Sequence, residues 1–285
     1  MIATRQRRGA PAAAPTYWEN RLLHGGVAVL ILAAFSVALA MLVPVDVEWD
    51  VQALVNDRRS LKLIPVSVRA LDWYMALVTL PTAAHHLYMA SRSPVWWQAY
   101  VAGRFSLVRW AEYTVTSTAM TTRIAVLSGV ADLGSLLCIA GMSAATIALG
   151  GVFEYLMAIP GDPKLPASTL RSVAWNLFGI SSALFVAHWG VILGTFIAAA
   201  SGSGDVPAWV YSAFVGVLLL DLGFPAVAIY SALRPRRPYQ RVDMFYSLLS
   251  IFVKQFYIYL IAFGFASYQR LDPVTTTVAS PAFWH

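Results

Sequence analysis

The stretch 241-RVDMFYSLLSIFVKQFYIYLIAFGFASYQR-270 decides the fold, because from Met244 to Tyr268 it forms one apolar and aromatic run as long as a membrane-spanning helix. Lys254 lies near the middle of this run, in a chain that has only three lysines. It follows Arg241 by thirteen residues, which is roughly 20 Å along a helix. An amine at that depth cannot easily reach the interface, so it needs a partner or a chemical purpose.

The composition is that of a membrane protein. Of the 285 residues, 59% are hydrophobic and 12% charged, and the mean hydropathy is +0.64. A soluble domain of this size cannot bury so much apolar surface. The net charge of +6 is spread over short segments between apolar runs, which argues against nucleic acid as a partner. The single cysteine, Cys138, excludes a disulfide framework, and we expect it to have a packing role.

Seven segments are apolar and long enough to cross a hydrocarbon core of about 30 Å, which takes roughly 20 helical residues. Helix-breaking sequences such as 160-PGDPKLP-166 and 234-RPRRP-238 separate them. We therefore predict an all-α membrane protein, a bundle of seven transmembrane helices. The predicted spans lie near residues 21–43, 70–90, 98–122, 131–151, 172–200, 207–232 and 242–268.

The distribution of Lys and Arg predicts the orientation. These residues are concentrated at the amino terminus and in the connections after the second, fourth and sixth spans, although the first loop also carries four of them. The positive-inside bias favours a cytoplasmic amino terminus and an outer carboxyl terminus. We expect a disordered cytoplasmic tail over residues 1–16, a helical domain over 17–270 and an outer tail over 271–285.

The first loop has the alternation of β-strands. In 43-VPVDVEWDV-51 apolar and polar residues alternate, and 61-LKLIPVSV-68 offers a second such run after the turn-forming 56-NDRRS-60. We predict a short outer β-hairpin in this loop.

A lysine at mid-membrane can be one half of a structural ion pair, or it can be an attachment point whose amine is consumed in a Schiff base. Glu112, well inside the third span, is one candidate partner, and Asp221 in the sixth span is another. Asp132, near the start of the fourth span, is expected at the interface.

Hydroxyl groups accompany the first candidate pair at helical spacing. Thr116 follows Glu112 by four residues and Tyr113 is adjacent to it, while Ser250 precedes Lys254 by one turn. Such hydroxyls can hydrogen-bond a buried pair and tune its proton affinity.

These residues resemble a known family. A mid-helix lysine in a seventh span and a carboxylate in the third are similar to the microbial rhodopsins, and within them the chain resembles the heliorhodopsins over residues 17–268. The resemblance rests on 109-RWAEYTVT-116, on 250-SIFVK-254, on the inverted orientation and on the histidines of the first two spans. It implies all-trans retinal bound to Lys254 as a protonated Schiff base, with Glu112 as its counterion.

Two departures from the pumping rhodopsins are informative. Ser250 stands where those proteins usually carry an aspartate, so Glu112 is left as the main negative charge. Arg123 stands where they often have a proton donor, three turns after the carboxylate of the third helix. Outward proton pumping by the usual relay is therefore disfavoured.

Histidines cluster towards the predicted cytoplasmic half. His24 opens the first span and 85-HH-86 closes the second. On position alone, a histidine near a helix end is more often an interfacial residue or one already satisfied by neighbours than a proton carrier. The resemblance implies a polar cavity here, and it favours His86 over His85 because Thr82 then lies one turn before it. His188, in the fifth span, is expected to pack or to line a pocket.

Three functions compete. The first is a light-sensing photoreceptor. The second is light-driven or light-gated proton transport, in which Asp221, Glu154 and the histidines could extend the path of the proton. The third is a protein without photochemistry in which Lys254 and Glu112 form a structural pair. The sequence shows no nucleophile with its base, no metal-ligand cluster and no phosphate loop, so we do not expect an enzyme. Besides retinal and membrane lipid, the expected partner is a second copy of the chain, because heliorhodopsins form homodimers.

Overall fold

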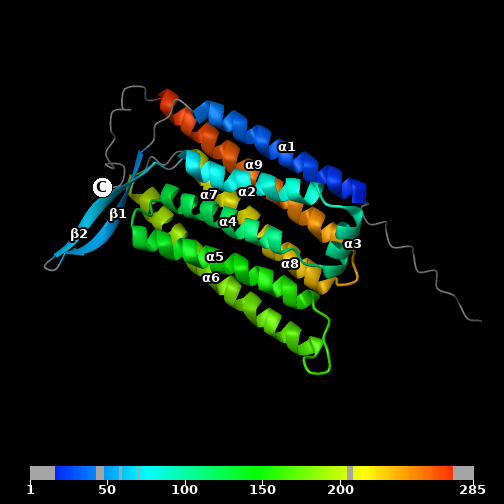
Figure 1. Cartoon of the computed structure of the whole chain (residues 1–285). Helices are drawn as coiled ribbons and strands as arrows, with labels where there is room; N and C mark the ends of the chain where they lie inside the picture. Colours follow the sequence, from blue (N-terminus) through cyan, green and yellow to red (C-terminus); the bar gives the residue numbers. More distant parts are fainter. Residues whose placement is uncertain (1–16, 43–47, 58–59, 70, 204–207, 272–285) are drawn as a thin grey trace, which may run out of the picture.

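The computed structural model describes residues 17–42, 48–57, 60–69, 71–203 and 208–271, and these form a bundle of long helices with a two-stranded sheet at one end (Figure 1). The short helix α3 lies at the opposite end. In chain order the helices are α1 (Tyr17–Leu42), α2 (Leu71–Ala90), α3 (Pro94–Gly103), α4 (Leu107–Leu127), α5 (Leu133–Ala158), α6 (Ala167–Ser203), α7 (Ala208–Asp221), α8 (Gly223–Leu233) and α9 (Tyr239–Leu271).

The two ends of the helical part lie at opposite ends of the bundle. Helix α1 begins beside α3, whereas α9 ends at the side of the sheet (Figure 1). Helix α1 packs against both α2 and α9, so the first and last helices are neighbours in space. The tail predicted for residues 1–16, and that predicted for 271–285 beyond Leu271, lie outside the described residues.

The first loop forms strands β1 (Glu48–Asp57) and β2 (Ser60–Arg69), which pair antiparallel. The backbone register places Trp49 opposite Val68 and Val55 opposite Lys62. Both segments whose alternation predicted strands contribute residues to this sheet, β1 beginning at Glu48.

The predicted span from 98 to 122 is wrong at its start, because the chain turns between α3 and α4. Arg104 adopts a left-handed conformation with φ of 52°, which ends α3. The hydroxyl of Ser106 then accepts a hydrogen bond from the backbone N–H of Arg109 and caps the start of α4. Helix α4 therefore begins at Leu107.

The predicted span from 207 to 232 is interrupted near its middle. Helix α7 ends at Asp221 and α8 begins at Gly223. Pro225 explains the interruption, because it has no N–H to donate to the carbonyl of Asp221 and its ring crowds that carbonyl.

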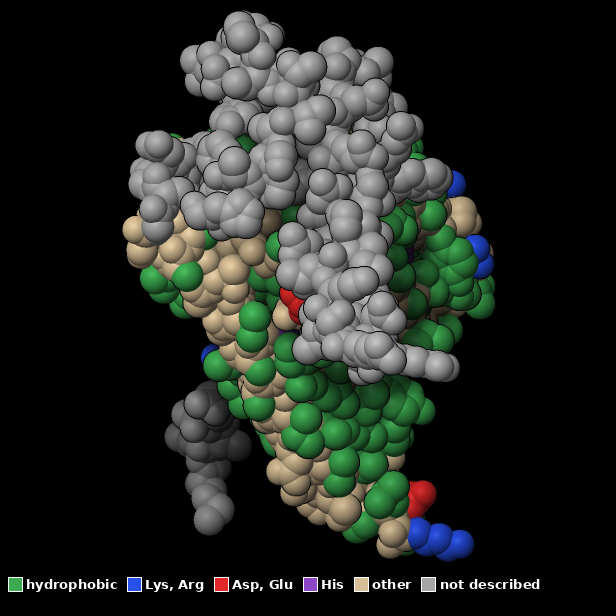
Figure 2. All heavy atoms as spheres, turned by 90° about the vertical axis from the view of Figure 1, so that its left-hand side faces the viewer, with side chains coloured by type: hydrophobic (Ala, Val, Ile, Leu, Met, Phe, Trp, Pro, Cys, Tyr) green, Lys and Arg blue, Asp and Glu red, His purple; other side chains and the backbone are tan. Residues whose placement is uncertain are grey.

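The helices have the character of a membrane protein. Four stretches of the described chain are long and apolar enough to cross a membrane: Tyr17–Val37, Leu133–Ala158, Ala167–Ser201 and Ala208–Leu233. Hydrophobic side chains, drawn in green, cover much of the helix surface that is not grey in Figure 2. Helices α4 and α9 are less apolar because they carry most of the buried charged residues, which lipid alone could not accommodate.

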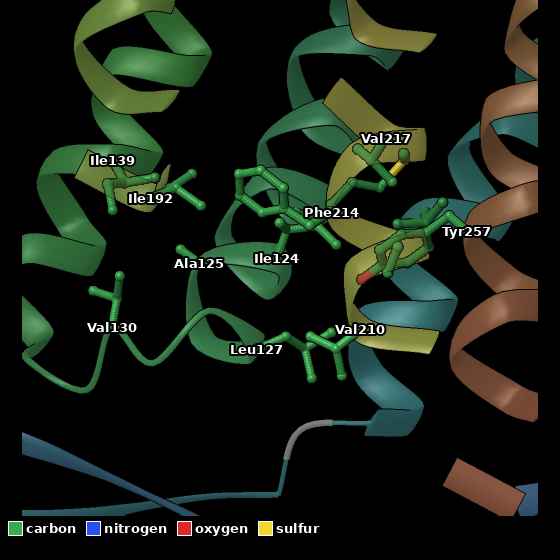
Figure 3. Packing of buried hydrophobic residues seen from close by; sticks show 14 of the residues in the cluster. Ile124, Ala125, Leu127, Val130, Ile139, Ile192, Val210, Phe214, Val217 and Tyr257 are labelled. Carbon is green, nitrogen blue, oxygen red and sulfur yellow. The ribbon is translucent and has the colours of Figure 1, made fainter. Parts of the chain in front are cut away.

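The largest apolar cluster joins α2, α4, α5, α6, α7 and α9. Ile139 of α5 meets Ile192 of α6, and Phe214 of α7 lies between them and Tyr257 of α9 (Figure 3). Val253 and Tyr257, on either side of Lys254 in sequence, both belong to this cluster. The lysine is thus held at the edge of an apolar and aromatic interior.

Two glycines bring α7 and α8 close to α9. A Cβ atom at Gly216 would lie 2.3 Å from the ring of Phe256, and one at Gly223 would lie 2.9 Å from Leu249. Both distances are too short for a real side chain. The two contacts fall on either side of Lys254 along α9.

Candidate functional site

Lys254 of α9 and Glu112 of α4 meet in the interior of the bundle. The Nζ atom of Lys254 lies 2.5 Å from Oε1 of Glu112, and both side chains are 3% exposed. A bare ammonium or carboxylate at this depth would be strongly destabilised, so each group compensates the other. The structure therefore brings together the two residues that the sequence singled out.

Three hydroxyls surround this pair. Nζ of Lys254 donates to Ser250 Oγ at 2.8 Å. Glu112 Oε1 accepts from the hydroxyls of Thr82 at 2.5 Å and Thr116 at 3.1 Å. All three are buried, so they hold the pair in one geometry without help from solvent.

Tyr113 contributes in a different way from the one expected. Its hydroxyl donates to the backbone carbonyl of Tyr246 at 3.1 Å. The centroid of its ring lies 5.1 Å from Nζ of Lys254, within the range of a cation–π interaction. The ring of Tyr113, not a hydrogen bond from its hydroxyl to the pair, stabilises positive charge at the lysine.

The second carboxylate oxygen of Glu112 is unsatisfied. Within the described part of the chain, Oε2 has no hydrogen-bond partner. The nearest cationic candidate is Nδ1 of His85 at 3.7 Å, which is too long for a hydrogen bond. A buried carboxylate oxygen without a donor is costly. The site therefore has capacity for one more proton or donor at this oxygen.

His86 points away from Glu112 and towards α1. Its Nδ1 atom lies 2.8 Å from Nδ1 of His24, and Nε2 of His24 lies 3.1 Å from Oδ2 of Asp243. An N···N contact this short needs one hydrogen between the two nitrogens. His85 and His86 are thus both buried but have different neighbours, His85 facing the counterion candidate and His86 facing His24.

A second buried ionic cluster adjoins these histidines. The guanidinium of Arg109 donates to Asp243 Oδ1 at 2.9 Å and to Glu154 Oε2 at 2.6 Å. Arg109 is 1% exposed, so two carboxylates compensate one buried cation. Further donors to these carboxylates are the hydroxyl of Tyr100, which reaches Asp243, and the indole of Trp110 and hydroxyl of Tyr239, which reach Glu154.

Sequence reasoning missed most of this cluster. In the sequence, Arg109 is only one residue of a motif and Glu154 only a possible residue of a proton path. Asp243 does not stand out there, because it follows Arg241 so closely. A signal was present, since Asp243 precedes Lys254 by eleven residues, which is three helical turns on the same face. The partners on α4 and α5 could not be recognised from spacing within one helix.

The other acidic candidates lie elsewhere. Asp221 is buried at the end of α7, and the described residues provide it with no hydrogen-bond or ion-pair partner. Asp132 is exposed and caps α5, where the backbone N–H of Ser135 donates to its carboxylate and holds the pKa of Asp132 below its usual range. His188 is buried, with Nδ1 2.9 Å from the carbonyl of Leu184.

An integral membrane helix bundle with a lysine–carboxylate pair at its centre is the architecture of the rhodopsin class of membrane proteins. The sequence profile of the heliorhodopsins matches residues 21–265. The chain therefore belongs to the heliorhodopsin family. No match was found among curated proteins.

Membership in this family implies a rhodopsin that binds retinal. The site is chemically suited to that group. Lys254 supplies a primary amine, Glu112 a carboxylate with an unsatisfied oxygen, and the adjoining aromatic cluster an apolar lining.

Proposed function

We propose that this heliorhodopsin is a light-sensing photoreceptor that binds all-trans retinal on Lys254 as a protonated Schiff base, with Glu112 as counterion. The observation that carries the proposal is the buried contact of 2.5 Å between these two side chains at the edge of the aromatic interior. When bound, retinal supplies visible absorption and isomerisation. The protein supplies the negative charge of Glu112 that balances the positive charge on the nitrogen atom of Lys254.

The residues around Lys254 can hold or release a proton at defined atoms. Glu112 compensates positive charge on the lysine nitrogen, while Ser250 and the ring of Tyr113 stabilise it there. Oε2 of Glu112 is free to accept a proton, and His85 lies beyond it at 3.7 Å. A proton that leaves the lysine nitrogen would remove the charge pairing between α4 and α9. That change can favour a second arrangement of the helices.

Light-driven or light-gated proton transport is the alternative function. It is favoured by the polar chain that runs from His86 through His24 to Asp243. The chain continues to Arg109, whose fixed positive charge opposes the passage of a proton. We therefore prefer the signalling function, in which the proton stays within the interior. A photocurrent measurement separates the two. We propose no catalytic activity.

For the membrane topology we propose seven spans, α1, α2, α4, α5, α6, α7 together with α8, and α9. The amino terminus is cytoplasmic, and the β1–β2 sheet and the carboxyl terminus are outside. The support is the excess of Lys and Arg at the α3 end of the bundle and the placement of the sheet at the other end (Figure 1). The domain limits stay at 1–16, 17–270 and 271–285.

We also propose a homodimer in which the segment 43–68 contributes to the contact. Its support is the family resemblance, the alternating pattern of the two strands and the general preference for symmetric pairs. Cross-linking and sedimentation in mild detergent should give a dimer, and a monomer in both would contradict it. The downstream signalling partner is left unassigned.

Retinal addition tests the proposed function. Purified protein mixed with all-trans retinal should develop a visible band, and Lys254→Ala should stay colourless. Lys164→Ala is the matched control because that lysine lies in the exposed loop between α5 and α6, and it should keep the band. If borohydride still fixes retinal to the Lys254→Ala protein, another residue is the attachment point and the proposal fails.

A further inference from the structure

A cavity opens between the end of α5, the start of α6 and the end of α8, away from the lysine site. Its volume is about 180 Å³. Its apolar wall includes Phe153, Met157 and Trp175, and two arginines, Arg104 and Arg171, also line it. The bundle end that holds the α5–α6 connection is opposite the β1–β2 sheet (Figure 1).

Neither arginine is neutralised by the residues that the structure describes. Arg104 donates one hydrogen bond, to the backbone carbonyl of Arg237 at 2.9 Å. Arg171 is exposed and has no hydrogen-bond or ion-pair partner in the part of the chain that the structure describes. No carboxylate among those residues forms an ion pair with either guanidinium. The two cations therefore keep donors available at the cavity.

Glu154 also lines the cavity, and its negative charge would oppose an anion. Both of its oxygens are already occupied. Oε2 accepts from Arg109 and Trp110, and Oε1 accepts from Tyr239. Even with Glu154 counted at full negative charge, the two arginines of the lining, Arg104 and Arg171, leave the cavity with a net positive charge.

We propose that this cavity binds a phosphate-bearing anion, with the guanidiniums of Arg104 and Arg171 donating to the phosphate oxygens. Arginine matches phosphate well because its donors form a planar fork. The volume is below the roughly 300–1,000 Å³ of sites for whole small-molecule ligands, so it suits a headgroup-sized anion. The apolar wall suits carbon attached to that phosphate, as in an anionic phospholipid of the adjoining leaflet. Free phosphate has the same anionic chemistry and is the second source to test.

The experiment uses the full-length protein in neutral detergent, with two probes in separate titrations. One probe is dioctanoyl phosphatidylglycerol and the other is inorganic phosphate, and dioctanoyl phosphatidylcholine serves as the zwitterionic reference. Calorimetry should show binding of phosphatidylglycerol, with affinity lowered about tenfold in Arg104→Gln or Arg171→Gln, the size expected for the loss of one charge-assisted hydrogen bond. Arg171→Gln is the cleaner variant because, among the described residues, this side chain has no hydrogen bond or ion pair to lose.

Arg236→Gln is the matched control, since it removes one exposed positive charge beside α8 without touching the cavity. It should leave the affinity unchanged. Binding of phosphatidylglycerol alone, with this arginine dependence, identifies a lipid headgroup. Equal dependence for inorganic phosphate identifies a free anion. Failure of both probes to bind above the reference, or an equal loss in all three variants, overturns the proposal. Because no step requires retinal, the result is independent of the proposed light-sensing function.

Discussion

Nε2 of His24 lies 3.1 Å from Oδ2 of Asp243, which connects the start of α1 to the start of α9 in the interior of the bundle. A carboxylate only accepts hydrogen bonds, so Nε2 must carry the hydrogen. Nδ1 of His24 is then left to share one proton with Nδ1 of His86. Asp243 thus fixes the orientation of the His24 ring. It also limits how many protons His24 and His86 can hold together.

Asp243→Asn should destabilise the protein. Arg109 would lose one of its two carboxylates, and removing one partner from a buried ion pair costs roughly 3–5 kcal/mol. Because Glu154 remains bound to Arg109, we expect the lower end, about 3 kcal/mol. The measurement is resistance to denaturant. Asp162→Asn, in the exposed α5–α6 loop, is the control and should change stability far less. Equal stability of the two variants would show that Asp243 has no structural role.

If Lys254 carries retinal as proposed, Glu112→Gln should remove the negative charge that keeps the lysine nitrogen protonated. At neutral pH some or all of the visible band should move to the near ultraviolet, and any pigment that stays protonated should absorb further to the red. Asp221→Asn is the matched control and should leave the band largely in place, because no hydrogen bond or ion pair joins Asp221 to Lys254. A silent Glu112→Gln together with a bleached or shifted Asp221→Asn would move the active centre to α7.

His85 and His86 should have separable effects. His85→Asn should shift the pH dependence of the visible band, because Nδ1 of His85 lies 3.7 Å from the carboxylate of Glu112. His86→Asn breaks the contact with His24 and should instead alter the rate at which a proton returns after a flash. Absorbance titration and flash photolysis give the two readings. The assignment of roles fails if one variant changes both readings and the other changes neither.

Tags at the two ends test the topology. An epitope at the amino terminus should be accessible only from the cytoplasm, and one placed after Arg270 only from outside. The physical basis is the charge asymmetry together with an odd number of spans. Accessibility of both tags from one side would mean that the spans have been miscounted.

The sequence predicts the central pair well because depth alone makes Lys254 and Glu112 conspicuous. A charge in an apolar run demands a partner, and few carboxylates are deep enough to provide one. The Arg109 cluster is less visible, since Asp243 and Arg109 both lie near helix ends where charges are ordinarily hydrated. Only the packing of α4, α5 and α9 reveals that they are buried together. The start of α4 is hard to locate from the sequence for a similar reason. Helix α3 is apolar too, so α3 and α4 together look like one continuous apolar span, and the turn between them does not interrupt it.

The glycines of α7 and α8 have a consequence for engineering the interior of the bundle. A library that varies buried residues one position at a time treats each position as independent. Here Phe256 and Leu249 each fill the space left by a missing side chain on the facing helix, at Gly216 and Gly223. A larger residue at either glycine requires the facing side chain on α9 to move or to be replaced by a smaller one. Gly216 and Phe256 should therefore be varied together, and so should Gly223 and Leu249.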